Sequence, residues 1–445
     1  MTRTTVAGGA FAVLLVLVVL ILAVGRRDLE QHRDPARTLS PAIPPSNVAE
    51  TPRGFLYGRV TTAGGTSYEG RLRWGGNEEA FWGDYFNGSK DENPWATHVP
   101  PDRLTERRPF KILGFKIADR ERPIDLGRPF MARFGDIARV EARDGLTVTL
   151  KSGAVFELDR FDASDFDDGV RVWDGRRGVV DLDARQIRII ELFPAARPGA
   201  APDRLHGTVR TRQGDFTGFI QWNRRASVGA DELDGHTADG ELSLRFDTIG
   251  SIARLPPDSC RVTLLDGGEI VLSDARDVSH GHRGIFVDDR RYGRVLVSWD
   301  GFESVEFSRG GRGPSFNDFP PGSPLTGSVT TRGGNRLVGR LVYDLDESET
   351  TETLDAPSEN VNYSIPFGLI ASVVSADGDR RDVQRARVTL HDGEELQLER
   401  AGDLGEGNAG MLIFVDGRQR PEYVPWSDVQ RVDFDRPATM NPPSG

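Results

Sequence analysis

One string occurs three times along the chain, and this repetition constrains the fold more than any other feature. It is GRVTTAGGTSYEGRLRW at 58–74, GTVRTRQGDFTGFIQW at 207–222 and GSVTTRGGNRLVGRLVY at 327–343. Each copy has Gly-x-Val-x-Thr, a glycine-containing turn and Gly-x-aliphatic-x-aromatic. Apolar residues at period two on both sides of a turn predict a β-hairpin. The glycine inside each strand indicates a bend or bulge of the kind that curls a small sheet.

The residues after each hairpin repeat as well. A short segment that we expect to be a loop ends in Phe86-Asn87-Gly88, Leu233-Asp234-Gly235 or Leu354-Asp355-Ala356. Phenylalanine and aliphatic residues spaced three apart follow, and their β-branching and short run favour a bent strand over a helix. A further hairpin has matched apolar positions, and Asp266-Gly267 and Asp392-Gly393 are typical of its turn. We therefore expect three aliphatic patterns that fill three separate interiors.

Breaks rich in proline, glycine and small residues separate these units. The sequence predicts an all-β fold of three tandem β-rich modules, built as small curled sheets or barrels, after a single N-terminal transmembrane helix. The predicted boundaries are 1–25 for the anchor or signal segment, 26–54 for a flexible linker, 55–193 for module 1, 194–204 for a linker, 205–307 for module 2, 308–324 for a linker, 325–434 for module 3 and 435–445 for a tail.

Residues 6–25, VAGGAFAVLLVLVVLILAVG, form an unbroken apolar stretch. Twenty residues of helix span about 30 Å, the thickness of the hydrocarbon core of a bilayer. This length favours an uncleaved membrane anchor, although Ala23-Val24-Gly25 also offers the small residues of a signal cleavage site. Arginines follow the stretch, which favours a cytoplasmic location for the residues after it. However, a very short segment before an apolar stretch is typical of an export signal. We expect a single-pass protein whose body lies outside the cytoplasmic membrane.

Composition argues against nucleic acid as a partner. The formal net charge is −12, whereas proteins that bind DNA or RNA carry a basic face that neutralises phosphates. The single cysteine, Cys260, cannot form an intrachain disulfide, so the fold must depend on core packing. At the start of a Cys-Arg-Val-Thr-Leu strand, Cys260 is better explained as a packing residue than as a nucleophile.

Two resemblances accompany this pattern. The Val-x-Thr-x-x-Gly and Gly-x-Leu positions of each first hairpin resemble the Sm-like and SH3-like small barrels over about 17 residues per unit. Counterparts of the RNA-contacting loop residues of Sm proteins are not evident in this sequence. The second half of each unit, with Val-Thr-Leu-x-Asp-Gly and Trp-x-x-Phe-x-x-Val-x-Phe, resembles exported bacterial proteins of no assigned role. Neither resemblance implies an activity.

Residues 74–95 hold the strongest candidate ligand site. Trp74 and Phe86 match core positions of the other units, but Trp82, Tyr85 and Trp95 do not. Clustered aromatic side chains next to carboxylates suit a glycan or a peptide. The predicted ligand-binding residues are Trp82, Tyr85, Trp95, Glu79 and Asp84. The alternative is that these aromatic residues cover unit one or pack on its neighbour.

Two clusters of residues that can ligate metals are candidate metal sites. Asp277, His280 and His282 lie close together in the sequence, and two histidines two residues apart on a strand would point to one side, as in many zinc sites. Unit three has Asp403 at the matching place, with no histidine after it. The run Asp162, Asp165, Asp167 and Asp168 has the composition of a calcium loop, but Arg176 replaces the closing glutamate of an EF-hand. A solvated loop is the alternative for both.

The function that fits these features best is a membrane-anchored binding or scaffolding protein of the cell envelope, because tandem modules on a tether favour multivalent contact. Its expected partners are the membrane, through residues 6–25, and a protein or glycan of the envelope; no cofactor is expected. Two alternatives stay open. One is a hydrolase of envelope polysaccharide that uses acidic residues near the aromatic residues of unit one. The other is a membrane adaptor that faces the cytoplasm.

Overall fold

The computed structural model describes residues 51–438 apart from 75–79, 84, 92, 102–104, 113–114, 124–128, 144, 160–163, 197, 200–202, 311–313 and 376–384. The predicted anchor at 6–25 and most of the predicted first linker and tail lie outside the described residues. Within the described ranges, no helix is long and apolar enough to cross a membrane. We use the names repeat one, repeat two and repeat three for residues 55–193, 205–307 and 325–434.

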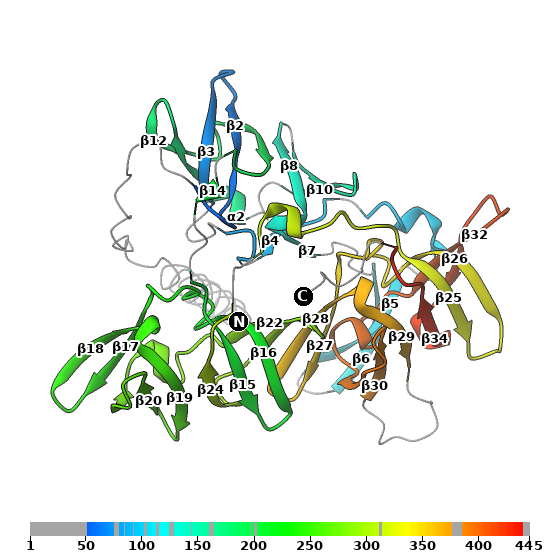
Figure 1. Ribbon diagram of the computed structural model, residues 1–445. Coiled ribbons are helices and arrows are strands. Elements are labelled where there is room, and N and C mark those ends of the chain that lie inside the picture. Colours follow the sequence, from blue (N-terminus) through cyan, green and yellow to red (C-terminus); the bar gives the residue numbers. More distant parts are fainter. Residues whose placement is uncertain are drawn as a thin grey trace, which may run out of the picture. The chain divides into compact units, whose positions relative to one another are not determined.

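The fold is all-β, as the sequence predicts (Figure 1). Helices in the described part are single turns that join strands. They are α2 (Ser164–Asp167) and the 3-10 helices η1 (Ala96–His98), η3 (Phe134–Asp136), η4 (Phe246–Thr248), η5 (Arg276–Val278), η6 (Phe316–Asp318), η7 (Phe367–Leu369), η8 (Gly402–Leu404) and η9 (Trp426–Asp428).

Three large antiparallel sheets hold most of the strands. The first has the order β10 (Val155–Leu158), β9 (Leu146–Leu150), β8 (Ile137–Ala142), β13 (Ile187–Leu192), β2 (Tyr57–Thr62), β3 (Ser67–Trp74), β11 (Val170–Asp174) and β12 (Gly178–Leu182). The second has β18 (Gly240–Arg245), β17 (Glu232–Thr237), β21 (Glu269–Ser273), β20 (Ser259–Leu264), β19 (Ile249–Leu255), β24 (Phe302–Phe307), β15 (His206–Thr211), β16 (Gly214–Gln221), β22 (Ile285–Asp289), β23 (Gly293–Val297), β28 (Val361–Pro366) and β27 (Thr353–Ser358). The third has β31 (Glu395–Glu399), β30 (Arg385–Leu390), β29 (Ile370–Val374), β34 (Val429–Phe434), β25 (Thr326–Thr331), β26 (Arg336–Val342), β32 (Met411–Val415) and β33 (Glu422–Val424).

One strand order recurs in the three sheets. It is β9-β8-β13-β2-β3-β11-β12 in the first, β20-β19-β24-β15-β16-β22-β23 in the second and β30-β29-β34-β25-β26-β32-β33 in the third. In each sheet the last strand of the repeat (β13, β24 or β34) pairs with the first (β2, β15 or β25). The repeated sequence therefore corresponds to a repeated topology.

A turn segment follows each first hairpin, at 223–231 and 344–352 for example, but the three residues that we expected to end it lie in strands. Phe86-Asn87-Gly88 lies in β4 (Tyr85–Ser89), which pairs with β7 (Pro129–Arg133). Leu233 and Leu354 lie in the matching hairpins β17–β18 and β27–β28. Each repeat thus has a second antiparallel strand pair, which is a hairpin in repeats two and three and has further strands between its members in repeat one. Two smaller pairs complete the described strands: β5 (Thr105–Ile112) with β6 (Phe115–Pro123), and β1 (Thr51–Pro52) with β14 (Pro198–Gly199).

A β-bulge explains the spacing of three that resembled a helix. The phenylalanine of each Phe-x-x-Ile motif opens a 3-10 helix, η3, η4 or η7, and the isoleucine begins the next strand. The register then shifts after Ile137, Ile249 and Ile370. A bulge adds one residue to its strand, so two inward-facing residues are three apart.

The repeated glycines face each other across the first hairpin. Gly58 pairs with Gly70, and the same pairing recurs in the other two repeats. A Cβ atom on Gly70 would lie 1.9 Å from the carbonyl oxygen of Trp173. Only glycine permits this approach of neighbouring strands, so the motif allows the close bend that the sequence predicts.

The matched aliphatic residues fill the interior. Val60, Val209 and Val329, for example, are fully buried. Repeats two and three nevertheless share one continuous hydrophobic cluster, and repeat one has its own. The expectation of three separate interiors is therefore wrong for the second and third repeats.

The shared core results from strand pairing between repeats two and three. Strand β28 of repeat three pairs antiparallel with the edge strand β23 of repeat two. Phe216, Tyr292 and Tyr363 pack edge to face across this joint, with centroids 5.6–5.9 Å apart. The segment 314–319, expected to be part of a linker, packs on repeat one: Phe319 joins its core, and Lys151 Nζ lies 3.4 Å from the ring centroid of Phe316.

Candidate functional site

Strand pairing defines one equivalent surface on each repeat, which we call the outer face. It consists of two rows of cross-strand neighbours, and such neighbours point to the same side of a sheet. On repeat one the rows are Tyr57, Arg71, Trp173, Val179 and Arg73, Arg171, Asp181. On repeat two they are His206, Phe219, Asp288, Arg294 and Gln221, Phe286, Leu296. On repeat three they are Thr326, Arg340, Phe414 and Val342, Leu412, Tyr423.

The outer face of repeat two holds Trp82 and Tyr85 of repeat one. The Trp82 carbonyl oxygen accepts hydrogen bonds from Arg294 Nη2 at 2.8 Å and from Gln221 Nε2 at 3.3 Å. The Arg294 guanidinium lies 4.9 Å from the ring centroid of Tyr85. Trp82 and Tyr85 are only 4% and 7% exposed. Main-chain and aromatic contacts together therefore fix this segment on the face.

Arg204 stacks beside this face. Its guanidinium lies 4.4 Å from the Trp82 ring and 4.1 Å from the Phe219 ring, a sandwich of a cation between two aromatic side chains. Its side chain is fully buried, and burial lowers its pKa to about 9. Asp288 lies 3.6 Å from Arg204 Nη2 and accepts a hydrogen bond from Arg294 Nε at 2.9 Å. Burial also raises the pKa of Tyr85 to about 12, so its hydroxyl is neutral at physiological pH.

The outer face of repeat three holds the next part of the same segment. The ring of Trp95 lies edge-on to Phe414 with centroids 5.9 Å apart, and the Arg340 guanidinium lies 5.4 Å from the Trp95 centroid. Val99 packs with Val342 and Leu412 in a small cluster. Equivalent faces of two repeats thus bind aromatic side chains from one segment, and an arginine contacts an aromatic ring in both.

Between these two contacts, Lys90 enters an acidic loop of repeat three. Its Nζ lies 2.5 Å from Asp346 Oδ1 and 3.3 Å from Glu352 Oε1, and all three side chains are nearly buried. Burial lowers the pKa of Lys90, but the neighbouring carboxylates, Glu352 first, raise it by more, so Lys90 stays charged. Glu352 Oε2 also accepts hydrogen bonds from two backbone N–H groups of its loop. Lys90 and the two carboxylates therefore form a buried ion-pair network between repeats one and three.

The predicted ligand-binding aromatic residues are therefore in contact with other repeats. Trp82 and Tyr85 lie on repeat two and Trp95 on repeat three, which matches the alternative that they pack on a neighbour. Glu79 and Asp84 lie outside the described residues. Contact of the five with a ligand from outside the chain stays a prediction.

Asp277 has a structural position that recurs in repeat three. Its carboxylate accepts hydrogen bonds from Asn223 Nδ2 at 2.6 Å and from the backbone N–H of Asp234 at 3.3 Å, and its carbonyl accepts one from Trp222 Nε1. Asp403 likewise accepts from the Asp355 N–H and from the Tyr343 hydroxyl. Asp277 thus ties the second hairpin to the core.

The two histidines of the predicted zinc site are engaged separately. His280 is exposed, and its Nδ1 lies 3.3 Å from Asp258. His282 is buried and stacks on Trp299 at 4.9 Å; burial, followed by nearby Arg283, lowers its pKa to about 3. Across the ranges that the structure describes, no three His, Cys, Asp or Glu side chains gather as a metal site would require.

The aspartate residues of the predicted calcium loop lie in and around α2. Asp162 lies outside the described residues, and Asp165 is at the place in repeat one that corresponds to Asp277 and Asp403. Asp167 and Asp168 are exposed. Cys260 is fully buried, and burial raises the pKa of its thiol to about 12, as expected of a packing residue.

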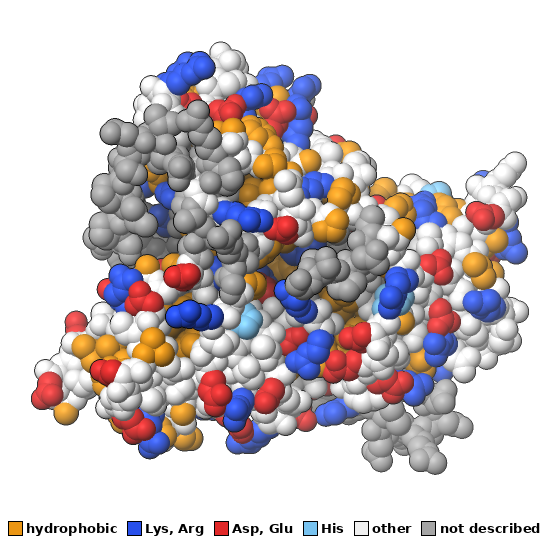
Figure 2. Space-filling view, viewed as in Figure 1, with side chains coloured by type: hydrophobic (Ala, Val, Ile, Leu, Met, Phe, Trp, Pro, Cys, Tyr) orange, Lys and Arg blue, Asp and Glu red, His pale blue; other side chains and the backbone are white. Residues whose placement is uncertain are grey.

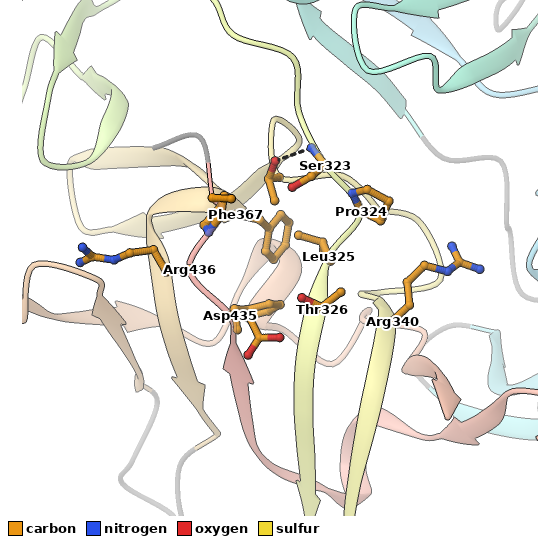
Figure 3. Close-up of a pocket in the computed structure, with 12 residues that line it drawn as sticks. Ser323, Pro324, Leu325, Thr326, Arg340, Phe367, Asp435 and Arg436 are labelled. Carbon is orange, nitrogen blue, oxygen red and sulfur yellow. Dashed lines mark hydrogen bonds between the residues drawn. The ribbon is translucent and has the colours of Figure 1, made fainter. Parts of the chain in front are cut away.

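A cavity of about 460 Å³ lies at the base of repeat three (Figure 3). Leu325, Phe367 and Phe434 form its apolar wall, and Ser323, Thr326 and Asp435 add polar groups. The side chains of Arg340 and Arg436 extend away from its centre: Arg340 stacks on Phe414, and Arg436 donates to the carbonyl of His391. The two arginines of the lining are therefore not directed at an occupant, and Asp435 is the acidic residue of the lining.

Comparisons with known proteins do not assign the chain to a family. No family model matches it, and no curated protein matches it. A solved structure described as a streptogramin B lyase is weakly similar, with 8% identity, coverage of 68% of this chain and 94% of that chain, and a TM-score of 0.12. Similarity at this level supports no argument about fold or function.

Sequence reasoning missed the outer faces, although a signal was present. The strand MLIFV at 411–415 and the run IFV at 285–287 are continuously apolar. Such runs are typical of strands that are covered on both sides, whereas a strand with one solvated side alternates apolar and polar residues.

The surface visible in Figure 2 carries interspersed acidic and basic side chains.

Proposed function

We propose that the protein is a membrane-anchored binding or scaffolding protein of the cell envelope, whose modules bind segments on their outer faces. The observation that supports this most is the recurrence of one binding geometry. Equivalent faces of repeats two and three each bind an aromatic side chain of the 82–99 segment through ring and arginine contacts. A surface that binds a segment twice in one chain is suited to bind segments of other proteins.

The sequence supports the location in this proposal. The apolar stretch at 6–25 has the length of a membrane-spanning helix, and a tether rich in proline follows it. A module held at a membrane by a tether meets its partners at a raised effective concentration. Three modules in series therefore suit a scaffold.

Membrane location is tested with the full chain carrying a reporter at its C-terminus that is active only outside the cytoplasm. We expect the chain in the membrane fraction with an active reporter, and the same chain lacking residues 6–25 in the soluble fraction. An active cytoplasmic reporter on the membrane-bound chain would instead support the adaptor that faces the cytoplasm.

Binding is tested with the detergent-solubilised full chain against purified envelope polysaccharide and defined envelope proteins. We expect saturable binding to a protein without cleavage of the polysaccharide. Release of soluble sugar fragments by the chain would support the hydrolase, and absence of any binding would contradict the scaffold.

A further inference from the structure

We propose that strand β12 of repeat one is an acceptor edge, to which a partner protein adds an extended strand with an inward-facing aromatic side chain. The inference deepens the proposed binding function and rests on it, because it names the strand that binds and the chemistry of the partner. The precedent for the contact is the joint between repeats two and three, where β28 adds to β23.

Strand pairing makes β12, β23 and β33 equivalent. Each is the last strand of the recurring order, after β11, β22 or β32. The residues at one matching position of the three strands are Val180, Val295 and Glu422. Their cross-strand neighbours on β11, β22 and β32 are fully buried, so all three residues lie on the interior side of their sheets.

The edges of repeats two and three are closed in different ways. Strand β28 covers β23, where Val295 pairs with Tyr363 and is fully buried. Strand β33 has three residues, lies between Pro421 and Pro425, and carries the charged Glu422 at the interior position. Short length, proline and an inward-pointing charge each discourage the addition of another strand. The edge of repeat two is thus occupied, and that of repeat three is blocked.

Within the described chain, the edge of repeat one is neither covered nor blocked. Strand β12 is the last strand of its sheet, and its residues Gly178, Val179 and Asp181 are exposed. A Cβ atom on Gly178 would meet no atom within 4 Å, whereas one on the equivalent Gly293 would lie 2.4 Å from the ring of Pro366 in β28. An open edge strand offers backbone N–H and C=O groups with which another strand can pair.

The joint between repeats two and three shows which side chain the added strand carries. There Tyr363 of β28 packs edge to face on Phe216 and Tyr292, with centroids 5.9 and 5.6 Å away. Strand pairing places Tyr68 and Arg177 at the two equivalent positions of repeat one. The Arg177 guanidinium lies 5.0 Å from the Tyr68 ring. An aromatic side chain at the place of Tyr363 would complete this cluster through ring and cation–π contacts.

A second copy of the chain fits this edge less well. The strand of repeat two that corresponds to β28 is β18, an end strand of its sheet. In the register of β28 on β23, β18 of a second copy would place Glu241 opposite Asp181, and opposed like charges destabilise a strand pair. Strand β12 of a second copy, Gly-Val-Val-Asp-Leu, would bring no ring to Tyr68.

The occupant is therefore a strand of a different protein. In the β28 precedent, Asn362 stands at the place that Glu241 would take, and apolar and polar residues alternate around the tyrosine. We expect the partner strand to have the same alternation, with an uncharged residue opposite Asp181.

The test uses the full chain in detergent and a fluorescent peptide of residues 359–366, ENVNYSIP, which contains β28. We expect saturable binding and slower amide hydrogen exchange at 178–182. Val180→Glu, which copies the blocked edge of repeat three, should weaken binding at least about tenfold, because it puts a charge into the strand joint. Replacement of the peptide tyrosine, Tyr363→Ala, should weaken binding at least about fivefold.

Val155→Glu is the matched control. Val155 is a strand valine that is 57% exposed on β10, at the other end of the same sheet. This variant should bind the peptide as the wild type does. If Val180→Glu lowers the unfolding temperature, Val180→Thr decides, with a smaller expected loss of binding.

Equal binding by Val180→Glu, or protection from exchange at 155–158 in place of 178–182, would assign the peptide to another strand and overturn the inference. Equal binding of the Tyr363→Ala peptide, or no binding up to about 1 mM, would overturn it as well. Dimerisation of the wild-type chain that Val180→Glu abolishes would assign the edge to a second copy instead of a partner.

The inference and the proposed function fail in different ways. A full chain that binds an envelope protein but not the peptide would contradict the inference alone. A chain that binds the peptide at β12 but no envelope protein would contradict the proposed function alone.

Discussion

The imidazole of His282 packs against the indoles of Trp222 and Trp299, with centroids 5.1 and 4.9 Å away. Burial there disfavours the charged form, since an imidazolium would lose its hydration. In the unfolded chain the same group titrates near its ordinary pKa of about 6.5. Unfolding below that pH is therefore coupled to proton uptake by His282.

His282 accordingly predicts a pH dependence. Its folded pKa is depressed to about 3, so the stability that it contributes is complete above about pH 6.5 and is lost as the pH falls. Between pH 7.5 and 5.5 the wild type should lose about 1 kcal/mol more unfolding free energy than His282→Phe. Denaturant unfolding at both pH values measures this, and the variant cancels the contribution of other groups. Equal losses would show that His282 is not held neutral.

Lys90 shows the converse case, a buried charge that needs its partners. Lys90→Met leaves the carboxylates of Asp346 and Glu352 buried without their cation, which should cost about 3–5 kcal/mol of unfolding free energy. Arg212→Met is the control, because Arg212 forms a surface pair with Glu303 and its side chain is 83% exposed. It should change stability by less than about 0.5 kcal/mol. A loss below about 1 kcal/mol for Lys90→Met would mean that the network does not hold the repeats together.

At the scale of elements, the first hairpin of each repeat could be predicted from the sequence. Alternating apolar residues and a glycine-containing turn are signals that lie within one short segment. The bulges after Ile137, Ile249 and Ile370 could not, since a bulge mimics helical spacing in a single strand. The second hairpins were missed because their segments are short, and their partners can lie far away: β28 pairs with β23, and Val361 has Val297 as its partner. Pairing between strands so far apart in the sequence produces no periodic pattern of residues.

The paired glycines give a prediction for one element. Gly70→Ala would place a Cβ atom against the carbonyl oxygen of Trp173, and neither strand can move without losing its ladder. We expect a loss of about 3 kcal/mol or more, measured by denaturant unfolding. Gly175→Ala, in the same repeat, meets no atom within 4 Å and should stay within about 0.5 kcal/mol of the wild type. Similar stability of the two variants would contradict the observed register.

At the scale of the whole molecule, the described residues between 51 and 438 form one compact unit. Strand pairing joins repeats two and three, and the segment from Trp82 to Val99 contacts both of them. The sequence predicts the repetition, since each copy needs the same core pattern. It does not reveal these joints, because the residues that form them, such as Arg204, Arg294 and Phe414, differ between repeats. The aromatic residues that the sequence singles out contact neighbouring repeats, and the residues that they contact were not foreseen.

The central claim is that the outer faces bind aromatic segments of the chain, and a double-mutant cycle between Trp82 and Arg204 tests it most directly. The measurement is the unfolding free energy of wild type, Trp82→Leu, Arg204→Met and the double variant. The stacked geometry at 4.4 Å predicts a coupling energy of about 1–2 kcal/mol, because each single change removes the same contact. Additive losses, within about 0.3 kcal/mol, would show that the Trp82 ring is not held by the Arg204 guanidinium and would contradict the account.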